Sequence, residues 1–235
     1  MRVSTSERQT GEDTTTTLYP VTKTCAVWGT ASEYIEIGST SAFGAPDLNS
    51  RPPEMARSTI FAWVQRCPAC GYCAADISQA PGHAGVTVRS IRYRAQLVDS
   101  TMPELANSFL RQAIVDERAG DYASAAWAIV HAAWVCNDEE KPEAAQECRG
   151  KAAEMVMRAI ESGQEITEQR GAETAILVDL LRRAGRFAKA RQVIASRRPG
   201  IIDDVILKIL AFQELLIARG DVARYTLDEA VGAEA

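Results

Sequence analysis

Histidine is scarce in this 235-residue chain, which contains only His83 and His131. The sequence pairs no nucleophile with a base and has no glycine-rich phosphate loop, so it indicates no class of catalysis. His131 falls in an alanine-rich segment with helical periodicity, where we expect a packed side chain. The sequence therefore favours a binding protein over an enzyme.

Long hydrophobic runs are also absent. No apolar stretch reaches the roughly 18–20 residues that a membrane-spanning helix needs, and the polar first residues lack the apolar stretch of a signal peptide. We therefore expect a cytoplasmic protein that does not contact a membrane. In a reducing cytoplasm, clustered cysteines favour metal binding or redox chemistry over structural disulfides.

The six cysteines divide into two groups by position. Cys136 and Cys148 stand in helical patterns, where we expect small core side chains. The other four lie in the first third of the chain and are the candidate metal ligands: Cys25, Cys67, Cys70 and Cys73.

The chain divides by composition into three parts. Residues 1–17 are polar and rich in threonine, which predicts a flexible tail. Residues 18–83 hold short β-prone runs and a turn-rich stretch, 38–58, which predicts a long ordered loop. The three predicted strands fall within residues 17–28, 32–37 and 59–67. So small a β module has a poor hydrophobic core and usually needs an added cross-link, such as a bound metal, to be stable.

The sequence pattern of residues 84–235 predicts helices throughout, so the expected fold class is mainly α. Glycines, prolines and capping residues delimit the predicted helices, which cover residues 86–99, 103–120, 122–138, 141–160, 172–185, 186–196, 203–220 and 221–232.

Three of the predicted breaks between helices look alike, at residues 119–125, 184–190 and 219–225. In the first two, glycine is followed by an aromatic residue two positions later and by alanine five positions later. The aromatic side chain can fill the gap between paired helices while alanine lets them approach. This pattern resembles the turn of a tetratricopeptide repeat, so we expect helical hairpins in a degenerate repeat array.

The sharpest local motif is CPACGY at residues 67–72. A knuckle of this kind directs backbone amides at two thiolates, as zinc ribbons do when they present two of their four sulfurs. CAVWGT at residues 25–30 has the same spacing of its first cysteine and its glycine, but it carries Trp28 where the second cysteine belongs.

These motifs resemble the bacterial family grouped as domain of unknown function 2225. Its members share the knuckle, a similar loop and following helices such as those of residues 103–113 and 124–136. The loop resemblance is distinctive in Phe43-Gly44-Ala45-Pro46-Asp47-Leu48, Arg51-Pro52 and Glu54. It covers residues 18–165 well and the remainder loosely. The resemblance implies a zinc-ribbon-like module followed by tetratricopeptide-like helices and brings no established activity.

Carried over residue by residue, the family's knuckles leave Cys25, Cys67 and Cys70 as zinc ligands and place Trp28 at the fourth position. Cys73 or His83 could supply the missing bond, or three thiolates could hold zinc together with water. Alternatively, the site is free of metal and Trp28 fills the space. All three interpretations stay open at this point.

Non-enzymatic protein interaction or scaffolding is the function that the sequence favours, with stacked hairpins presenting a surface to a protein partner. One alternative is a nucleic-acid-binding zinc ribbon, which the net charge of −5 disfavours. Another is a thiol–disulfide protein that uses Cys67 and Cys70. A basic cluster in the acidic half is expected to be a solvated helix face or a docking site for an anionic partner: Arg182, Arg183, Arg186, Lys189, Arg191, Arg197 and Arg198.

Overall fold

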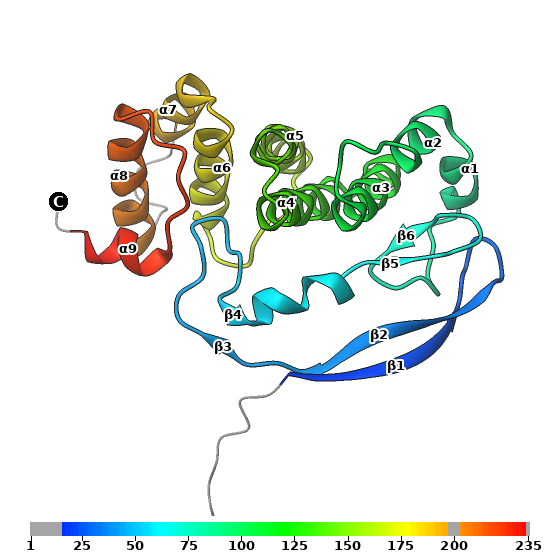
Figure 1. The fold of residues 1–235 in the computed structure, drawn as a ribbon. Coiled ribbons are helices and arrows are strands. Elements are labelled where there is room, and N and C mark those ends of the chain that lie inside the picture. The colour runs from blue at the N-terminus through cyan, green and yellow to red at the C-terminus, as the bar shows by residue number, and fades with distance from the viewer. Residues whose placement is uncertain (1–15, 197–202, 234–235) are drawn as a thin grey trace, which may run out of the picture.

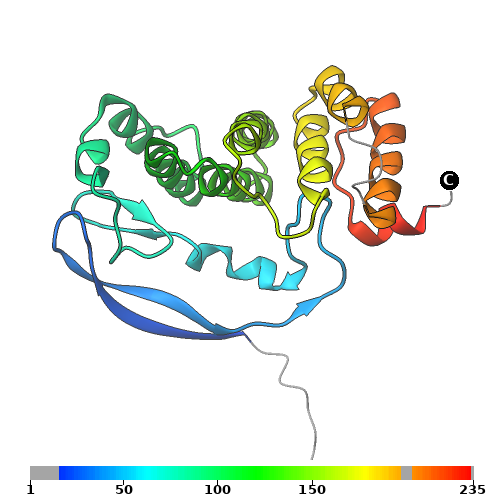
Figure 2. The same ribbon diagram turned by 180° about the vertical axis from the view of Figure 1, so that it is seen from behind.

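The computed structural model describes residues 16–196 and 203–233. Helices form an arch, and a small N-terminal β module runs beneath it along its length (Figures 1 and 2). The predicted mainly α fold class is confirmed. Most of the predicted tail lies outside the described residues, and Thr17 already belongs to the first strand.

The N-terminal module begins with an antiparallel hairpin of β1 (Thr17–Thr24) and β2 (Ala31–Ser39). Thr24 is paired with Ala31, so residues 25–30 form the turn. This turn is the CAVWGT knuckle, and the hairpin therefore carries Cys25 at its end.

The remaining strands are two residues long. β3 (Ala42–Phe43) pairs with β4 (Glu54–Met55), and β5 (Gln65–Arg66) pairs with β6 (Cys73–Ala74). The predicted loop of residues 38–58 thus contains a short β ladder.

The predicted strand over residues 59–67 is confirmed only at β5, because residues 56–62 form a 3₁₀ helix, η1 (Ala56–Ala62). Helical spacing lets Ile60, Trp63 and Val64 face the same core under the arch. The Trp63 indole also donates to the Thr59 hydroxyl one turn earlier, at 2.9 Å. Tertiary packing has here overridden a β-prone composition.

The helical half begins at residue 84, as the sequence predicts. Its helices are α1 (Ala84–Val88), α2 (Ile91–Leu97), α3 (Glu104–Ala119), α4 (Tyr122–Asp138), α5 (Pro142–Glu161), α6 (Ala172–Arg183), α7 (Phe187–Ala195), α8 (Asp204–Ala218) and α9 (Leu227–Gly232).

Two of the predicted helices differ from the structure. The one over residues 86–99 is split at Ser90, whose hydroxyl caps α2 by accepting from the Tyr93 amide. The one over residues 221–232 is helical only in α9. The residues before α9 are extended because they bond the loop: Leu48 N–H donates to Tyr225 O, and Leu227 N–H to Pro46 O.

The two glycine–aromatic turns form as predicted. Gly120 and Gly185 have φ of 78° and 71°, a left-handed conformation that glycine adopts without strain. The next helix starts two residues later in each case, at Tyr122 or Phe187. The third predicted turn, at residues 219–225, is not a helix–helix turn, since the chain leaves α8 to pair with the loop.

One hydrophobic core joins the module to the helices. Ile60, Val64 and Leu48 of the module share it with Phe109 and Trp134 of the arch. The N-terminal module therefore folds together with the helices and covers one side of them.

His131 is packed, as the sequence predicts. Its ring lies 5.1 Å from that of Trp63 and 5.2 Å from that of Phe109, measured between centroids. Burial lowers the pKa of His131 to about 4, so the imidazole is neutral at pH 7.

Candidate metal centre

Both knuckles have the same backbone geometry. In the first, Cys25 N–H donates to Thr30 O at 2.9 Å, and Gly29 N–H donates to Cys25 O at 2.8 Å. In the second, Cys67 N–H donates to Tyr72 O at 2.8 Å, and Gly71 N–H donates to Cys67 O at 2.9 Å. The backbone hydrogen bonds of the two hexapeptides therefore match, position for position.

Glycine is required in each turn. Gly29 has φ of 77° and Gly71 has φ of 75°, which residues with a side chain rarely adopt. A Cβ atom at Gly71 would also lie 3.0 Å from a Leu97 methyl group of α2. The second knuckle is thus seated closely on the helical half.

The knuckles bring three thiols together. The Sγ atoms of Cys25, Cys67 and Cys70 all lie within 4.8 Å of one another, and those of Cys25 and Cys70 are 3.8 Å apart. Sulfurs about 2.3 Å from a tetrahedral zinc ion lie about 3.8 Å apart. The three cysteines are close enough to hold a metal ion, and the Cys25–Cys70 distance is compatible with zinc.

Electrostatics favour a cation among these thiols. Burial acts to raise the pKa of Cys67, but the backbone amides of Cys70 and Ala69, with the two neighbouring thiols, lower it below its usual value. Burial raises the pKa of Cys70 to about 12, and its neighbouring thiols add to this effect. Cys67 and Cys70 therefore do not both ionise readily unless a positive charge lies beside them.

The cluster lies where the hairpin meets the first helices. Ala26 N–H donates to Ile77 O at 3.0 Å. A separate small core surrounds the thiols and includes Ile77, Val88 and Tyr93. A metal here would cross-link the hairpin end to the knuckle that α1 and α2 support.

The fourth predicted ligand, Cys73, lies outside this group. Its thiol donates to Gly71 O at 3.5 Å, and its amide donates to the Tyr93 hydroxyl at 3.1 Å. His83 is also engaged elsewhere, through a hydrogen bond between Nε2 and Val115 O at 3.2 Å. Trp28 does not fill the site, because its side chain is 62% exposed.

Cys136 and Cys148 are fully buried, as expected of small core residues. Their thiols interact across the α4–α5 pair, and this contact holds the pKa of Cys136 below its usual value while it raises that of Cys148. They lie in the main core and not among the metal-site thiols.

The basic cluster is not a single solvated face. Arg182 has no exposed surface, and Arg183 is 8% exposed. Arg186 bonds Gly150 O and Glu154, while Lys189 is exposed. Arg197 and Arg198 lie outside the described residues. Helical spacing predicted neither the burial of Arg182 and Arg183 nor the contact of α6 with the C-terminal segment that causes it.

The chain matches no protein-family model, no curated protein and no solved structure. The interpretation of the centre therefore depends on its geometry. In the described parts of the chain, no helix combines the length and apolar character needed to cross a membrane.

Proposed function

We propose that this chain is a non-enzymatic interaction protein whose N-terminal module is fastened to the helical arch by a structural zinc ion. The observation that carries the proposal is the cluster of Cys25, Cys67 and Cys70, whose sulfurs lie within 4.8 Å of one another, with Cys25 and Cys70 at 3.8 Å. Bound zinc would supply positive charge and a cross-link between two segments 42 residues apart in sequence, counted from Cys25 to Cys67. Such an ion contributes on the order of 10 kcal/mol to the folding of small modules.

Three thiolates and a water molecule form the coordination that we propose. Cys73 and His83 bond backbone carbonyls, and the Trp28 side chain, which is 62% exposed, offers no metal ligand. The resemblance to the domain of unknown function 2225 family is compatible with this site, with one of the four family cysteines replaced.

Zinc content tests this part of the proposal. We expect about one zinc ion per chain in the full-length protein and almost none in Cys67→Ser, because two thiols do not retain zinc. Cys136→Ser removes an equally buried thiol outside the cluster and is the matched control. Elemental analysis after dialysis against buffered zinc measures the zinc content per chain. Faster hydrogen exchange in β1 and β2 after chelation would show that the metal stabilises this hairpin. Zinc-free wild-type protein, or equal zinc in Cys67→Ser, would refute the site.

A groove between α2, α3 and α5 supports the interaction role. It has a volume of about 680 Å³ and an apolar floor that includes Leu110, Ile114 and Met155. Its rim carries both signs of charge, with Glu117 held between Arg92 and Arg158 at 2.6 Å from each. An apolar floor with a mixed charged rim suits the amphipathic helix of a protein partner, and methionine adapts to varied apolar side chains.

Site-specific photo-cross-linking tests the groove. We expect a cross-linker at Met155 to capture a partner that a cross-linker at Val205, an exposed position on α8, does not capture. The partner is then purified, and its affinity is measured for Met155→Glu and Val205→Glu. A loss of at least tenfold only in Met155→Glu is the expected result, since a buried unpaired charge opposes docking. Equal affinities of the two variants would refute this surface.

The two alternative functions have less support. Cys25, Cys67 and Cys70 are at most 7% exposed, so a substrate disulfide has no access to them. For nucleic-acid binding, Arg182 and Arg183 are buried in internal contacts and contribute little to a surface potential.

A further inference from the structure

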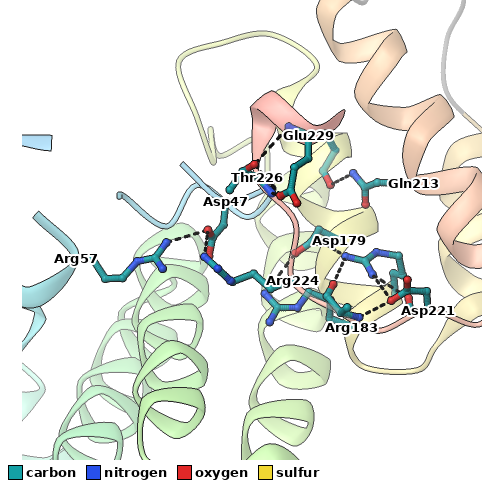
Figure 3. Close-up of polar contacts among 12 residues, drawn as sticks. Asp47, Arg57, Asp179, Arg183, Gln213, Asp221, Arg224, Thr226 and Glu229 are labelled. Atoms are coloured by element: carbon teal, nitrogen blue, oxygen red, sulfur yellow. Dashed lines mark hydrogen bonds and ion pairs between the residues drawn. The ribbon is translucent and has the colours of Figure 1, made fainter. Parts of the chain in front are cut away.

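A second polar centre lies at the other end of the module, where the loop, α4, α6 and the segment before α9 meet. It surrounds a cleft of about 290 Å³. The lining residues come from segments far apart in sequence: Asp47, Arg51, Arg57, Trp134, Asn137, Asp138, Arg183 and Arg224. Figure 3 shows Asp47 between Arg57 and Arg224, with Arg183 nearby on α6.

Arginines outnumber acids around this cleft. Asp47 is 1% exposed, and its Oδ1 accepts from Arg57 at 2.8 Å and from Arg224 at 3.0 Å. Arg51 donates to Asp138 at 2.5 Å. Arg183 comes no closer than 4.0 Å to Asp179. Four arginines therefore line a cleft with two aspartates, and positive charge is in excess.

Residues behind the cleft do not add to this excess, because Arg149 and Arg182 are matched by Asp179 and Asp221. Burial, with the charge of Arg183, lowers the pKa of Arg149 to about 9. Arg182 is neutralised by Asp179 at 2.6 Å, and it also donates to Asp221 O and Ala223 O at 2.8 and 2.9 Å. These bonds fix the extended segment that presents Arg224 to the cleft.

Several lining groups lack a hydrogen-bond partner. Among the described residues, the buried donors without an acceptor include Nε of Arg51, Nε of Arg183 and Nε1 of Trp134. The Arg51 and Arg183 side chains are 6% and 7% exposed. These atoms, like the unpaired Asp47 Oδ2, are too deeply buried for a ligand to reach. The donors open to a ligand are the guanidinium nitrogens at the cleft surface, chiefly those of Arg224, whose side chain is 51% exposed.

We propose that this cleft binds a small molecule bearing a phosphate group, such as a phosphate monoester. Guanidinium groups approach from three segments, which suits a tetrahedral oxyanion with several acceptor oxygens, whereas one forked arginine satisfies a carboxylate. The volume accommodates one phosphate and a small attached group. The Trp134 ring beside Arg51, 5.8 Å from its guanidinium carbon, would contact that group.

Calorimetric titration of the full chain with inorganic phosphate, pyrophosphate and citrate tests the site. We expect phosphate and pyrophosphate to bind at low salt, with citrate at least tenfold weaker. Arg224→Gln should weaken pyrophosphate binding about tenfold or more, because one charge-assisted contact is lost. Arg224 is half exposed, so the substitution leaves the core intact. Arg219→Gln makes the same charge change at an exposed residue outside the cleft and is the control.

Each outcome decides the proposal. Binding that weakens in Arg224→Gln but not in Arg219→Gln supports a phosphate site. Equal weakening in both variants would mean general charge attraction and overturn it. Stronger binding of citrate than pyrophosphate would overturn the phosphate preference, and no binding of any of the three would assign the arginines a purely structural role. Because none of these arms involves the cysteines, failure here leaves the zinc proposal unaffected.

Discussion

Replacing Trp28 with cysteine is expected to raise the zinc affinity of the chain by on the order of a hundredfold or more, since changes even in the groups that support metal ligands alter affinity by about 10- to 100-fold. Position 28 lies three residues after Cys25 and directly before Gly29, as Cys70 lies relative to Cys67 and Gly71. The matching hydrogen bonds of the two knuckles place the thiol introduced by Trp28→Cys where the fourth sulfur of a tetrahedral site would be. Competition against a chromogenic zinc chelator measures the change.

Little packing opposes this gain, because Trp28 is 62% exposed. Phe43→Cys is the matched control, since it replaces another exposed aromatic residue with cysteine outside the cluster. We expect the control to keep the wild-type affinity. If Trp28→Cys binds zinc no more tightly than Phe43→Cys does, the first knuckle does not direct its fourth residue toward the metal.

Arg182→Met is expected to lower the free energy of unfolding by about 3–5 kcal/mol, the usual cost of removing one partner from a buried ion pair. The substitution leaves Asp179, which is 1% exposed, without its 2.6 Å partner. It also leaves the carbonyls of Asp221 and Ala223 unbonded. Urea unfolding monitored by circular dichroism measures the loss.

Arg186→Met provides the contrast. Arg186 pairs with Glu154 at 2.8 Å, but both side chains are more than a third exposed. We expect a loss of about 1 kcal/mol or less, as for other surface pairs. Adding Asp179→Asn to Arg182→Met should recover part of the free energy of unfolding that Arg182→Met loses, because it removes the unpaired buried charge of Asp179. Equal losses for Arg182→Met and Arg186→Met would show that burial does not set the cost.

Local signals explain which elements could be predicted. Helical periodicity located the long helices, and glycine with a following aromatic residue located the turns at Gly120 and Gly185. The predictions failed at residues 59–62, which are helical, and at residues 221–226. In the first segment, packing under the arch imposes a helical turn. In the second, the loop around Leu48 supplies backbone partners and draws the chain into an extended form.

The sequence by itself determined the mainly α class, the knuckle at residues 67–72 and its thiol candidates, because each depends on residues within a few positions of one another. Only the tertiary structure decided that Cys25 joins Cys67 and Cys70 while Cys73 does not. It also buried Arg182 and Arg183, and it placed Arg224 against Asp47, 177 positions away. The spacing of residues along a helix or turn specifies which side chains share a local face, but which faces meet depends on how the whole chain buries its apolar surface.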